Sequence, residues 1–221
     1  MATDTPFALH PLRLRPISDS LLSWSPSSCR RSIRSGVRPG HEGEKVRIGH
    51  AAARLIREGE TIILDSGTTT VEIARQIKFL KLKSLTVITN ALNITTVLAN
   101  LPHLRVIVIG GILRQMSYST VGPQAEQILR AIKADRLFLG VDGLDSEIGL
   151  PTPDVREAQL NGLMIRVARE VTAVADASKF HRRSLAVIAD VSDVHRIITD
   201  DGADPKLVAA LRARNIEVMV V

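Results

Sequence analysis

The residues best placed to do chemistry lie in one stretch, Thr61 to Lys78, which reads TIILDSGTTTVEIARQIK. Residues 61–64 are β-branched or apolar and predict a buried parallel strand, whereas the apolar residues of 71–78 recur at helical spacing. A strand, a short polar loop and a helix make half of a βαβ unit. The candidate ligand-binding residues of this loop are Asp65, Ser66, Gly67, Thr68, Thr69 and Thr70.

This loop favours the binding of an anion. The first amide groups of a helix lack partners within the helix and point toward the preceding loop, where they and the helix dipole attract a group such as phosphate. Gly67 lets backbone approach a ligand closely. A helix cap rich in threonine is the alternative, although three successive threonines exceed what one cap needs. The pattern G-x-x-x-x-G-K-[ST] is missing, which excludes a nucleotide P-loop.

Four further predicted strands, at 84–89, 104–109, 136–141 and 171–175, also end in small or polar residues. Ligands of parallel sheets bind outside the carboxyl ends of the strands, so five such ends predict a polar ligand site at one edge. Ordinary turn chemistry is the alternative for any single end. No G-x-G-x-x-G with a following acid is present, which argues against a dinucleotide. The candidates at these ends are Asn90, Gly110, Gly111, Asp142 and Lys179.

The rest of the chain alternates strands with helices. We expect helices at 46–57, 90–100, 122–133, 152–169 and 205–214, further strands at 184–189, 195–199 and 216–221, and a loop at 112–120. The helix from Thr152 has a threonine cap, a proline at its first position and Asp154 in its first turn. We therefore predict an α/β fold with a mostly parallel sheet and helices on both faces.

Composition excludes several classes of protein. The 221 residues are 45% hydrophobic but only 3% aromatic, which favours buried aliphatic strands over an aromatic surface for nucleic acid. One cysteine excludes an internal disulfide and a cysteine-based metal site. No apolar run approaches the ~18 residues that span a bilayer. We expect a soluble, cytoplasmic protein with no membrane partner, no cofactor and no metal; its net charge of +6 permits weak attraction to polyanions.

Residues 1–44 differ from the rest. They are rich in serine, proline and arginine and keep no helical or strand period, so we expect a disordered or atypical segment before a domain at 45–221. A transit peptide is one alternative, although this stretch holds four acids and five prolines. A wrongly assigned start of the coding region is another.

Seven motifs together resemble the sensor domain of DeoR-family transcriptional regulators, from about Lys45 to Val221. They are D-S-G-T-T-T at 65–70, V-I-T-N-A-L-N at 87–93, G-G-I-L-R at 110–114, V-G-P-Q-A-E at 121–126, F-L-G-V-D-G at 138–143, G-L-P-T-P-D at 149–154 and D-A-S-K-F at 176–180. The resemblance is closest to regulators of amino-sugar operons. It implies a fold similar to ribose-5-phosphate isomerase, a phosphorylated sugar or amino sugar as effector, and a homo-oligomer.

The family also implies a winged helix-turn-helix that binds operator DNA. Residues 1–44 do not resemble that module, because no pair of amphipathic helices and no basic recognition helix is recognisable there. We therefore expect a regulator whose DNA-binding module is missing or truncated in this chain. Operator DNA is not expected to bind through this chain alone.

A sugar-phosphate isomerase is the competing interpretation. In the resemblance, Asp142 matches an isomerase acid and Glu157 matches a glutamate that acts as general base. Leu139 and Ile148 stand where that family places another acid and a lysine, and neither moves a proton. We therefore expect no catalytic residue and no enzyme activity, with Lys179 matching a separate lysine of its motif.

Two further residues complete the predicted effector site. Arg114 follows the Gly-Gly turn and is a forked donor for phosphate, with a solvated loop arginine as the alternative. Glu157 and Asp142 bracket the sugar in this interpretation, with an exposed helix acid as the alternative for Glu157. Asp65 either binds a sugar hydroxyl or caps the turn after it, and Asn90 either contacts the ligand or forms a turn.

Overall fold

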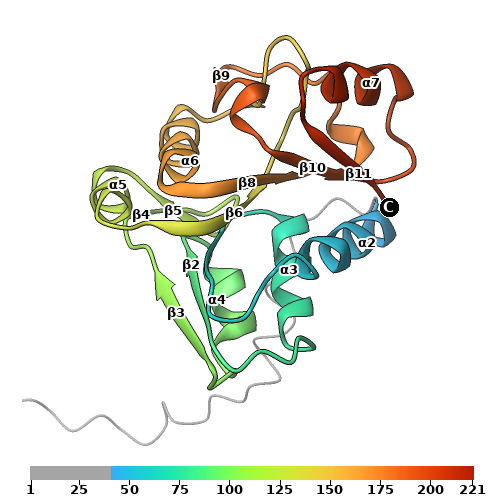
Figure 1. The fold of residues 1–221 in the computed structure, drawn as a ribbon. Helices are drawn as coiled ribbons and strands as arrows, with labels where there is room; N and C mark the ends of the chain where they lie inside the picture. Colours follow the sequence, from blue (N-terminus) through green and yellow to red (C-terminus); the bar gives the residue numbers. More distant parts are fainter. Residues whose placement is uncertain (1–40) are drawn as a thin grey trace, which may run out of the picture. The chain divides into compact units, whose positions relative to one another are not determined.

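A seven-stranded, fully parallel sheet lies at the centre of the described structure. The computed structural model describes residues 41–221, and its strands lie in the order β11-β10-β8-β6-β1-β2-β3 (Figure 1). The predicted α/β class is confirmed, whereas the segment predicted at 1–44 falls almost wholly outside the described residues. The strands are β1 Thr61–Leu64, β2 Leu85–Thr89, β3 Leu104–Val108, β6 Ala134–Gly140, β8 Ala168–Val174, β10 Arg196–Thr199 and β11 Glu217–Val220.

Helices cover both faces of the sheet, as the alternating pattern predicts. One face packs against α2 Glu42–Ala53, α3 Thr68–Ile77 and α4 Leu92–Leu98. The other packs against α5 Pro123–Arg130, α6 Val155–Val167 and α7 Pro205–Ala213 (Figure 1). Two short 3-10 turns, η2 Ala177–Lys179 and η3 Val191–Asp193, complete the helical elements of the described part. Within residues 41–221, no helix combines the length and the apolar character that a membrane crossing needs.

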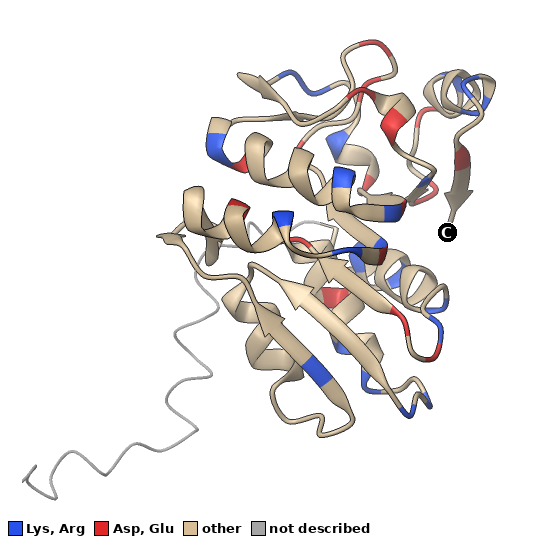
Figure 2. Cartoon of the chain, turned by 60° about the vertical axis from the view of Figure 1, so that its left-hand side comes forward, with Lys and Arg blue, Asp and Glu red and all other residues tan. Residues whose placement is uncertain are grey.

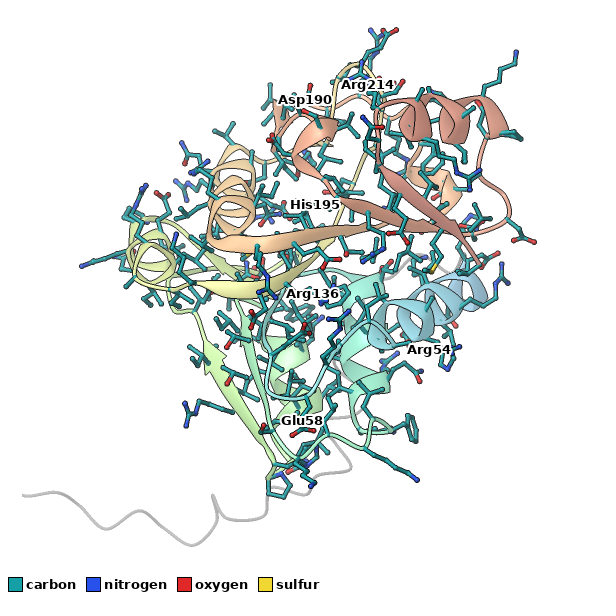
Figure 3. The ribbon with its side chains drawn as sticks, in the orientation of Figure 1. Arg54, Glu58, Arg136, Asp190, His195 and Arg214 are labelled. Atoms are coloured by element: carbon teal, nitrogen blue, oxygen red, sulfur yellow. The ribbon has the colours of Figure 1, made fainter. Side chains whose placement is uncertain are left out.

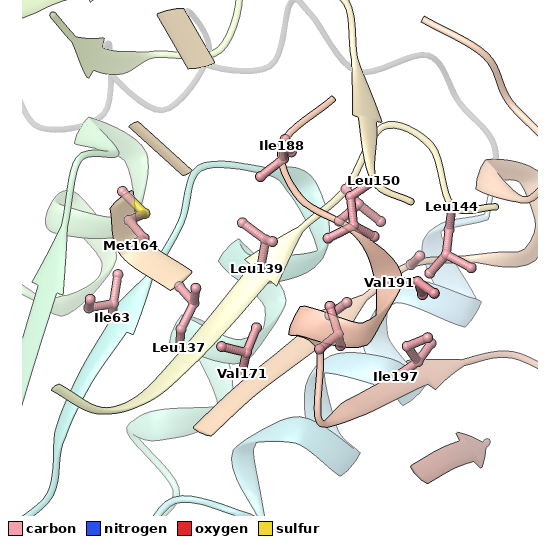
Figure 4. Packing of buried hydrophobic residues seen from close by; sticks show 14 of the residues in the cluster. Ile63, Leu137, Leu139, Leu144, Leu150, Met164, Val171, Ile188, Val191 and Ile197 are labelled. Carbon is pink, nitrogen blue, oxygen red and sulfur yellow. The ribbon is translucent and has the colours of Figure 1, made fainter. Parts of the chain in front are cut away.

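Neighbouring residues of β1 supply two separate cores, because successive side chains of a strand point to opposite faces. Ile63 packs with Leu137 and Leu139 on the face covered by α6 (Figure 4). Ile62 and Leu64 pack on the face covered by α2 and α3. A strand buried on both faces is an almost continuous apolar run, which explains why the central strands are visible in the sequence.

The strand order reverses between β1 and β6. From β1 the chain proceeds outward to β2 and β3, and then it crosses back to β6 and proceeds the other way to β8, β10 and β11. The loops after β1 and β6 therefore leave the same edge of the sheet toward opposite faces. Such a reversal opens a crevice at the carboxyl ends of the two strands, where ligands of α/β sheets bind.

A β-hairpin occupies residues 112–120, which the sequence analysis assigned wrongly to a loop. Strand β4 Ile112–Arg114 pairs antiparallel with β5 Ser119–Val121. The turn between them contains no glycine, proline or asparagine, and Tyr118 takes the positive φ of 50° that those residues usually provide. A second small pair joins β7 Pro151–Thr152 to β9 Ala186–Val187, so the strand expected at 184–189 is only two residues long.

The helix predicted at 46–57 spans 42–53 instead. Its two acidic residues in the first turn, Glu42 and Glu44, suit the positive end of the helix dipole. At its other end the amides of Leu55 and Ile56 donate to carbonyls three residues back, which tightens the chain into a turn. Glu42 and Glu44 therefore belong to a helix rather than to the atypical segment.

The helix predicted from Thr152 begins later, and its cap is Asp154. The Oδ1 atom of Asp154 accepts the amides of Arg156 at 2.9 Å and Glu157 at 3.0 Å, the arrangement of a helix N-cap. Asp154 is the cap because it directly precedes the first turn, where its carboxylate reaches two free amides. Thr152 lies two residues too early for this. Thr152 is thereby left in β7, where its hydroxyl is available to other side chains.

A ladder of ion pairs crosses the amino ends of the strands. Arg136 of β6 lies between Glu60 and Glu170, with Nε 3.2 Å from Glu60 Oε2 and Nη1 2.7 Å from Glu170 Oε2. Figure 3 labels Arg136 on the central sheet. Arg196 of β10 continues it from Glu170 to Glu217 of β11. Figure 2 shows all lysine and arginine positions of the described chain in blue and all aspartate and glutamate positions in red. Each buried charge of the ladder thus has a partner of opposite sign, as burial requires.

Candidate functional site

Asp65 is the buried centre of the candidate site. It follows β1 at the crevice, and its side chain is fully enclosed. Ser66 Oγ donates to its Oδ1 at 3.4 Å, and Asn161 Nδ2 of α6 donates to its Oδ2 at 3.3 Å. Gly140 at the end of β6 closes the other side, since a Cβ atom there would lie 3.8 Å from Asp65 Oδ2. Asp65 thus joins the ends of β1 and β6.

Helix α3 begins at Thr68, shortly after Asp65 and beyond the end of β1. Its N-cap is Gly67, with φ 152° and ψ 163° and no side-chain cap, so the alternative of a threonine-rich cap does not describe it. Thr68, Thr69 and Thr70 are the first residues of the helix rather than a loop before it, which corrects the predicted start at 71. The Thr70 hydroxyl donates to the Gly67 carbonyl at 3.0 Å, whereas Thr68 is exposed. The amides of this first turn lack helical partners and remain suited to an anion.

Two more acids approach from α6 and from the end of β6. Glu157 lies in the first turn of α6 and is mostly buried, while Asp142 follows β6 and is about half exposed. The Thr152 hydroxyl lies between them, 3.3 Å from Asp142 Oδ2 and 3.4 Å from Glu157 Oε2. The structure therefore brings together the carboxylates of Asp65, Asp142 and Glu157, which are far apart in the sequence.

Two of these carboxylates, those of Asp65 and Glu157, have raised pKa values. Burial raises the pKa of Asp65 well above its usual value, and the negative charges of Glu157 and Asp142 raise it further. Burial also raises the pKa of Glu157, against the opposing charge of Arg114. Perturbed acids in a crevice are typical of functional sites. A ligand that supplies hydroxyl or ammonium donors would relieve this arrangement.

Arg114 is held by acids rather than standing free. Its Nε lies 3.1 Å from Asp154 Oδ2, and its Nη1 lies 2.8 Å from Glu157 Oε2 and donates to Ser117 Oγ at 3.1 Å. The side chain is 21% exposed. Arg114 therefore lies in the predicted site, at the point where the β4–β5 hairpin meets α6, and its guanidinium is shared between Asp154 and Glu157.

Asn90 is enclosed between the β2 end and the hairpin. Its Nδ2 donates to the Thr120 carbonyl at 3.1 Å, and its Oδ1 is buried without a hydrogen-bond partner. Gly111 has a structural role, because a Cβ atom there would lie 2.6 Å from the Val121 carbonyl oxygen and its φ is 148°. Gly111 is thus the place where backbone passes tightly from β3 into the hairpin, whereas a Cβ atom at Gly110 would meet nothing within 4 Å.

Lys179 approaches the acids from the turn η2. Its Nζ lies 3.9 Å from Asp142 Oδ1, and the side chain is one quarter exposed. Asp176 caps this turn by accepting the Ser178 amide at 3.1 Å. Lys179 is therefore the second cation at the predicted site, beside Arg114.

Comparison with known proteins identifies the family. Residues 40–201 match the DeoR C-terminal sensor domain. The chain belongs to the DeoR sensor-domain family. One relative is a protein of Escherichia coli O157:H7 described as an aga operon transcriptional repressor, 41% identical over 174 residues, which are 79% of this chain and 64% of that protein.

A second relative of this DeoR sensor domain is the uncharacterised HTH-type transcriptional regulator YulB of Bacillus subtilis. It is 38% identical over 178 residues, which are 80% of this chain and 68% of YulB. The chain thus spans about two thirds of the length of these relatives. They are transcriptional regulators rather than enzymes, which agrees with the expectation from the sequence. Ribose-5-phosphate isomerase A of Methanocaldococcus jannaschii aligns with a TM-score of 0.47 at 16% identity, covering 64% of this chain and 55% of that one.

Two residues of the DeoR sensor domain's candidate site were missed by the sequence analysis. Asn161 lies in the middle of α6, 1% exposed, with Nδ2 on Asp65 and Oδ1 buried without a partner. A polar residue amid the buried run Leu160–Met164 was the available signal. Thr152 was assigned to a helix cap, whereas its hydroxyl lies between Asp142 and Glu157. The expectation that residues 1–44 lack a DNA-binding module falls on a segment that is almost entirely outside the described residues.

Proposed function

We propose that this DeoR sensor domain binds a phosphorylated sugar in the crevice between β1 and β6, and that it is the effector-responsive part of a transcriptional repressor. One observation carries the proposal: the start of α3 lies directly beside three interacting carboxylates. A Cβ atom at Gly140 of β6 would lie only 3.1 Å from the Ser66 carbonyl oxygen. The crevice thus offers a positive helix end for an anion next to acceptors for hydroxyl groups.

The proposed roles of the residues follow from these two parts of the crevice, the helix end for the anion and the carboxylates for the hydroxyl groups. The first-turn amides of α3, with Thr68, Thr69 and Lys179, bind the phosphate. Asp65, Asp142 and Glu157 accept hydrogen bonds from the sugar, and Arg114 and Asn90 complete its surroundings. Ser66 and Thr70 shape the loop through their bonds to Asp65 and the Gly67 carbonyl. Effector binding would then alter operator binding by the regulator, and the domain would work as a homo-oligomer.

The isomerase alternative has weaker support. Leu139 is fully buried in the core beneath α6, so the position of the missing acid faces packing and not the crevice. Ile148 is likewise apolar, and its amide donates to Asp145 Oδ1 at 3.1 Å. Deprotonation beside a carbonyl needs both a base and a group that stabilises the anion. Glu157 alone would supply the base, which favours binding without turnover.

Calorimetry tests the proposal with matched pairs of ligands: galactosamine and galactosamine-6-phosphate, glucose and glucose-6-phosphate, ribose and ribose-5-phosphate. We expect saturable binding of at least one phosphate and much weaker binding of its parent sugar. Thr68→Val should weaken that binding by about 1–3 kcal/mol, the usual value of a hydrogen bond to a charged group. Thr96→Val is the matched control, since Thr96 is an exposed helical threonine whose hydroxyl donates to the Leu92 carbonyl.

Equal affinity for a sugar and its phosphate would contradict the anion site. An isomerase assay on ribose-5-phosphate addresses the competing function. Turnover above about 1 per second, within the ordinary range of enzymes, that disappears in Glu157→Gln would favour an enzyme instead. Saturable binding without turnover would support the sensor.

A further inference from the structure

An ion pair links the first helix of the domain to the proposed effector site. Lys45 of α2 lies with its Nζ 3.3 Å from Asp176 Oδ2, and the two side chains are only 12% and 1% exposed. Lys45 also donates to the His41 carbonyl at 3.3 Å, at the start of α2. The pair thus joins α2 to the carboxyl end of β8, 131 residues later in the chain.

Asp176 in turn fixes the turn that carries Lys179. Its Oδ1 accepts both the amide and the hydroxyl of Ser178, and its carbonyl accepts the Lys179 amide at 2.9 Å. Burial raises the pKa of Asp176, but Ser178 and Lys45 outweigh burial and hold the pKa below its usual value. The carboxylate is therefore charged at neutral pH, and its cationic partner on α2 is a condition for burying it there.

Helix α2 also packs tightly behind α3. A Cβ atom at Gly49 would lie 2.6 Å from Glu72 Cβ and 2.9 Å from the Glu72 carbonyl carbon, so the two helices meet backbone to backbone. Figure 1 shows α2 and α3 side by side on one face of the sheet. The first turn of α3 is the proposed anion site. Helix α2 therefore contacts α3, whose first amides are one proposed phosphate-binding group. It also contacts Asp176, which holds the turn of Lys179, the other proposed group.

We propose that Lys45 is a positioning residue of the effector site, and that its ion pair with Asp176 couples occupancy of that site to helix α2. The inference rests on the proposed binding of a sugar phosphate. Lys45 does not touch the ligand; it holds Asp176, which holds the turn of Lys179. Because coupling between two sites is reciprocal, a phosphate that fixes Lys179 also fixes α2, and loosening α2 weakens the binding of phosphate.

The test compares variants of the full chain by calorimetry and by hydrogen exchange of the amides of 42–53. The probes are galactosamine-6-phosphate and inorganic phosphate. Lys45→Met and Lys45→Gln remove the charge, whereas Lys45→Arg keeps it. Arg47→Met is the matched control: Arg47 is a cation on the same helix, but its partners, Asp201 Oδ1 at 2.7 Å and the Val221 carbonyl, are not among the proposed effector-binding residues or Asp176.

We expect the phosphate probe to slow exchange across α2 in the wild-type chain. Lys45→Met and Lys45→Gln should weaken its binding about tenfold, within the usual range of coupling between sites, and abolish the response of α2. Lys45→Arg and Arg47→Met should keep both. A merely structural role would lower the melting temperature without removing the response of α2 to the probe.

Wild-type affinity in both charge-removing variants, or no response of α2 in the wild type, overturns the coupling while the proposed function stands. If neither inorganic phosphate nor any of the three sugar phosphates named above binds to the wild-type chain, the proposed function is overturned and this inference with it. If Lys45→Met does not fold, Lys45→Gln decides the question, because its amide retains a donor for the Asp176 carboxylate.

Discussion

Replacing Asp65 by asparagine should stabilise the empty domain while weakening its proposed ligand binding. The side chain is fully buried, and its environment consists of Ser66, Asn161 and the negative charges of Glu157 and Asp142, which raise its pKa well above the usual 3.8. Asparagine has nearly the same shape and keeps an oxygen for the donors. It removes the cost of ionising a carboxyl group in that place.

The sign and size of the effect follow from proton linkage. Above pH of about 3.8 the unfolded chain has lost the Asp65 proton while the folded chain keeps it, so the wild type loses stability as pH rises toward the folded pKa. The loss is about 1.4 kcal/mol per pH unit for one proton. Asp65→Asn lacks this loss, so its stability advantage should grow at that rate and then level off above the folded pKa.

Thermal unfolding of both proteins from pH 4 to pH 8 measures this difference. For a chain of this size 1 kcal/mol corresponds to about 2–4 °C, so the two melting temperatures should diverge by roughly 3–6 °C per pH unit within the window. Acids with lowered pKa, such as Asp154 and Glu170, affect both proteins alike. Glu147→Gln, at an exposed acid, is the control. A constant difference between Asp65→Asn and wild type, or a variant less stable at pH 7, would refute the reasoning.

Three further predictions concern other parts of the molecule. Arg136→Met should cost about 3–5 kcal/mol in chemical unfolding, because Glu60, 8% exposed, loses the partner that balances its buried charge; an unchanged unfolding midpoint would contradict it. Gly67→Ala should cost about 1–3 kcal/mol, since φ 152° and ψ 163° suit only glycine, and it should also weaken phosphate binding in calorimetry. Light scattering should find a dimer or tetramer, and a 24.1 kDa monomer at micromolar concentration would exclude it.

The central half of the fold is readable because its strands are buried on both faces. Ile62 to Leu64 and Leu137 to Leu139 form apolar runs ended by Asp65 and Asp142, and such runs allow few other structures. The edge of the sheet at which the candidate residues gather follows from the same pattern, since parallel strands end together. The match to the isomerase family added Glu157, and the place of Arg114 after the Gly110-Gly111 turn added that arginine; no strand end marks either residue.

The predictions that failed depend on contacts between distant residues. The turn of the β4–β5 hairpin has no glycine, proline or asparagine, and its Tyr118, with a positive φ, directly precedes the residue that pairs with Arg114. Asn161 has no local pattern, and its importance arises from Asp65, 96 residues earlier in the chain. Whether Arg114 binds phosphate stays a prediction, and the two acids that hold its guanidinium are visible only in the folded chain.

Buried acids are paired with arginines at the amino ends of the strands, whereas at the carboxyl ends acids outnumber the cations near them. At the amino ends, Glu60, Arg136 and Glu170 alternate in sign, and each carboxylate has a guanidinium within hydrogen-bond distance. At the carboxyl ends, Asp65 and Glu157 share a crevice with too few cations and have raised pKa values. A fold selected for stability alone would balance both ends. The unbalanced end is the one at which α3 begins, and for this reason we place the proposed sugar phosphate there, where its hydroxyl donors would meet the acids and its phosphate the helix start.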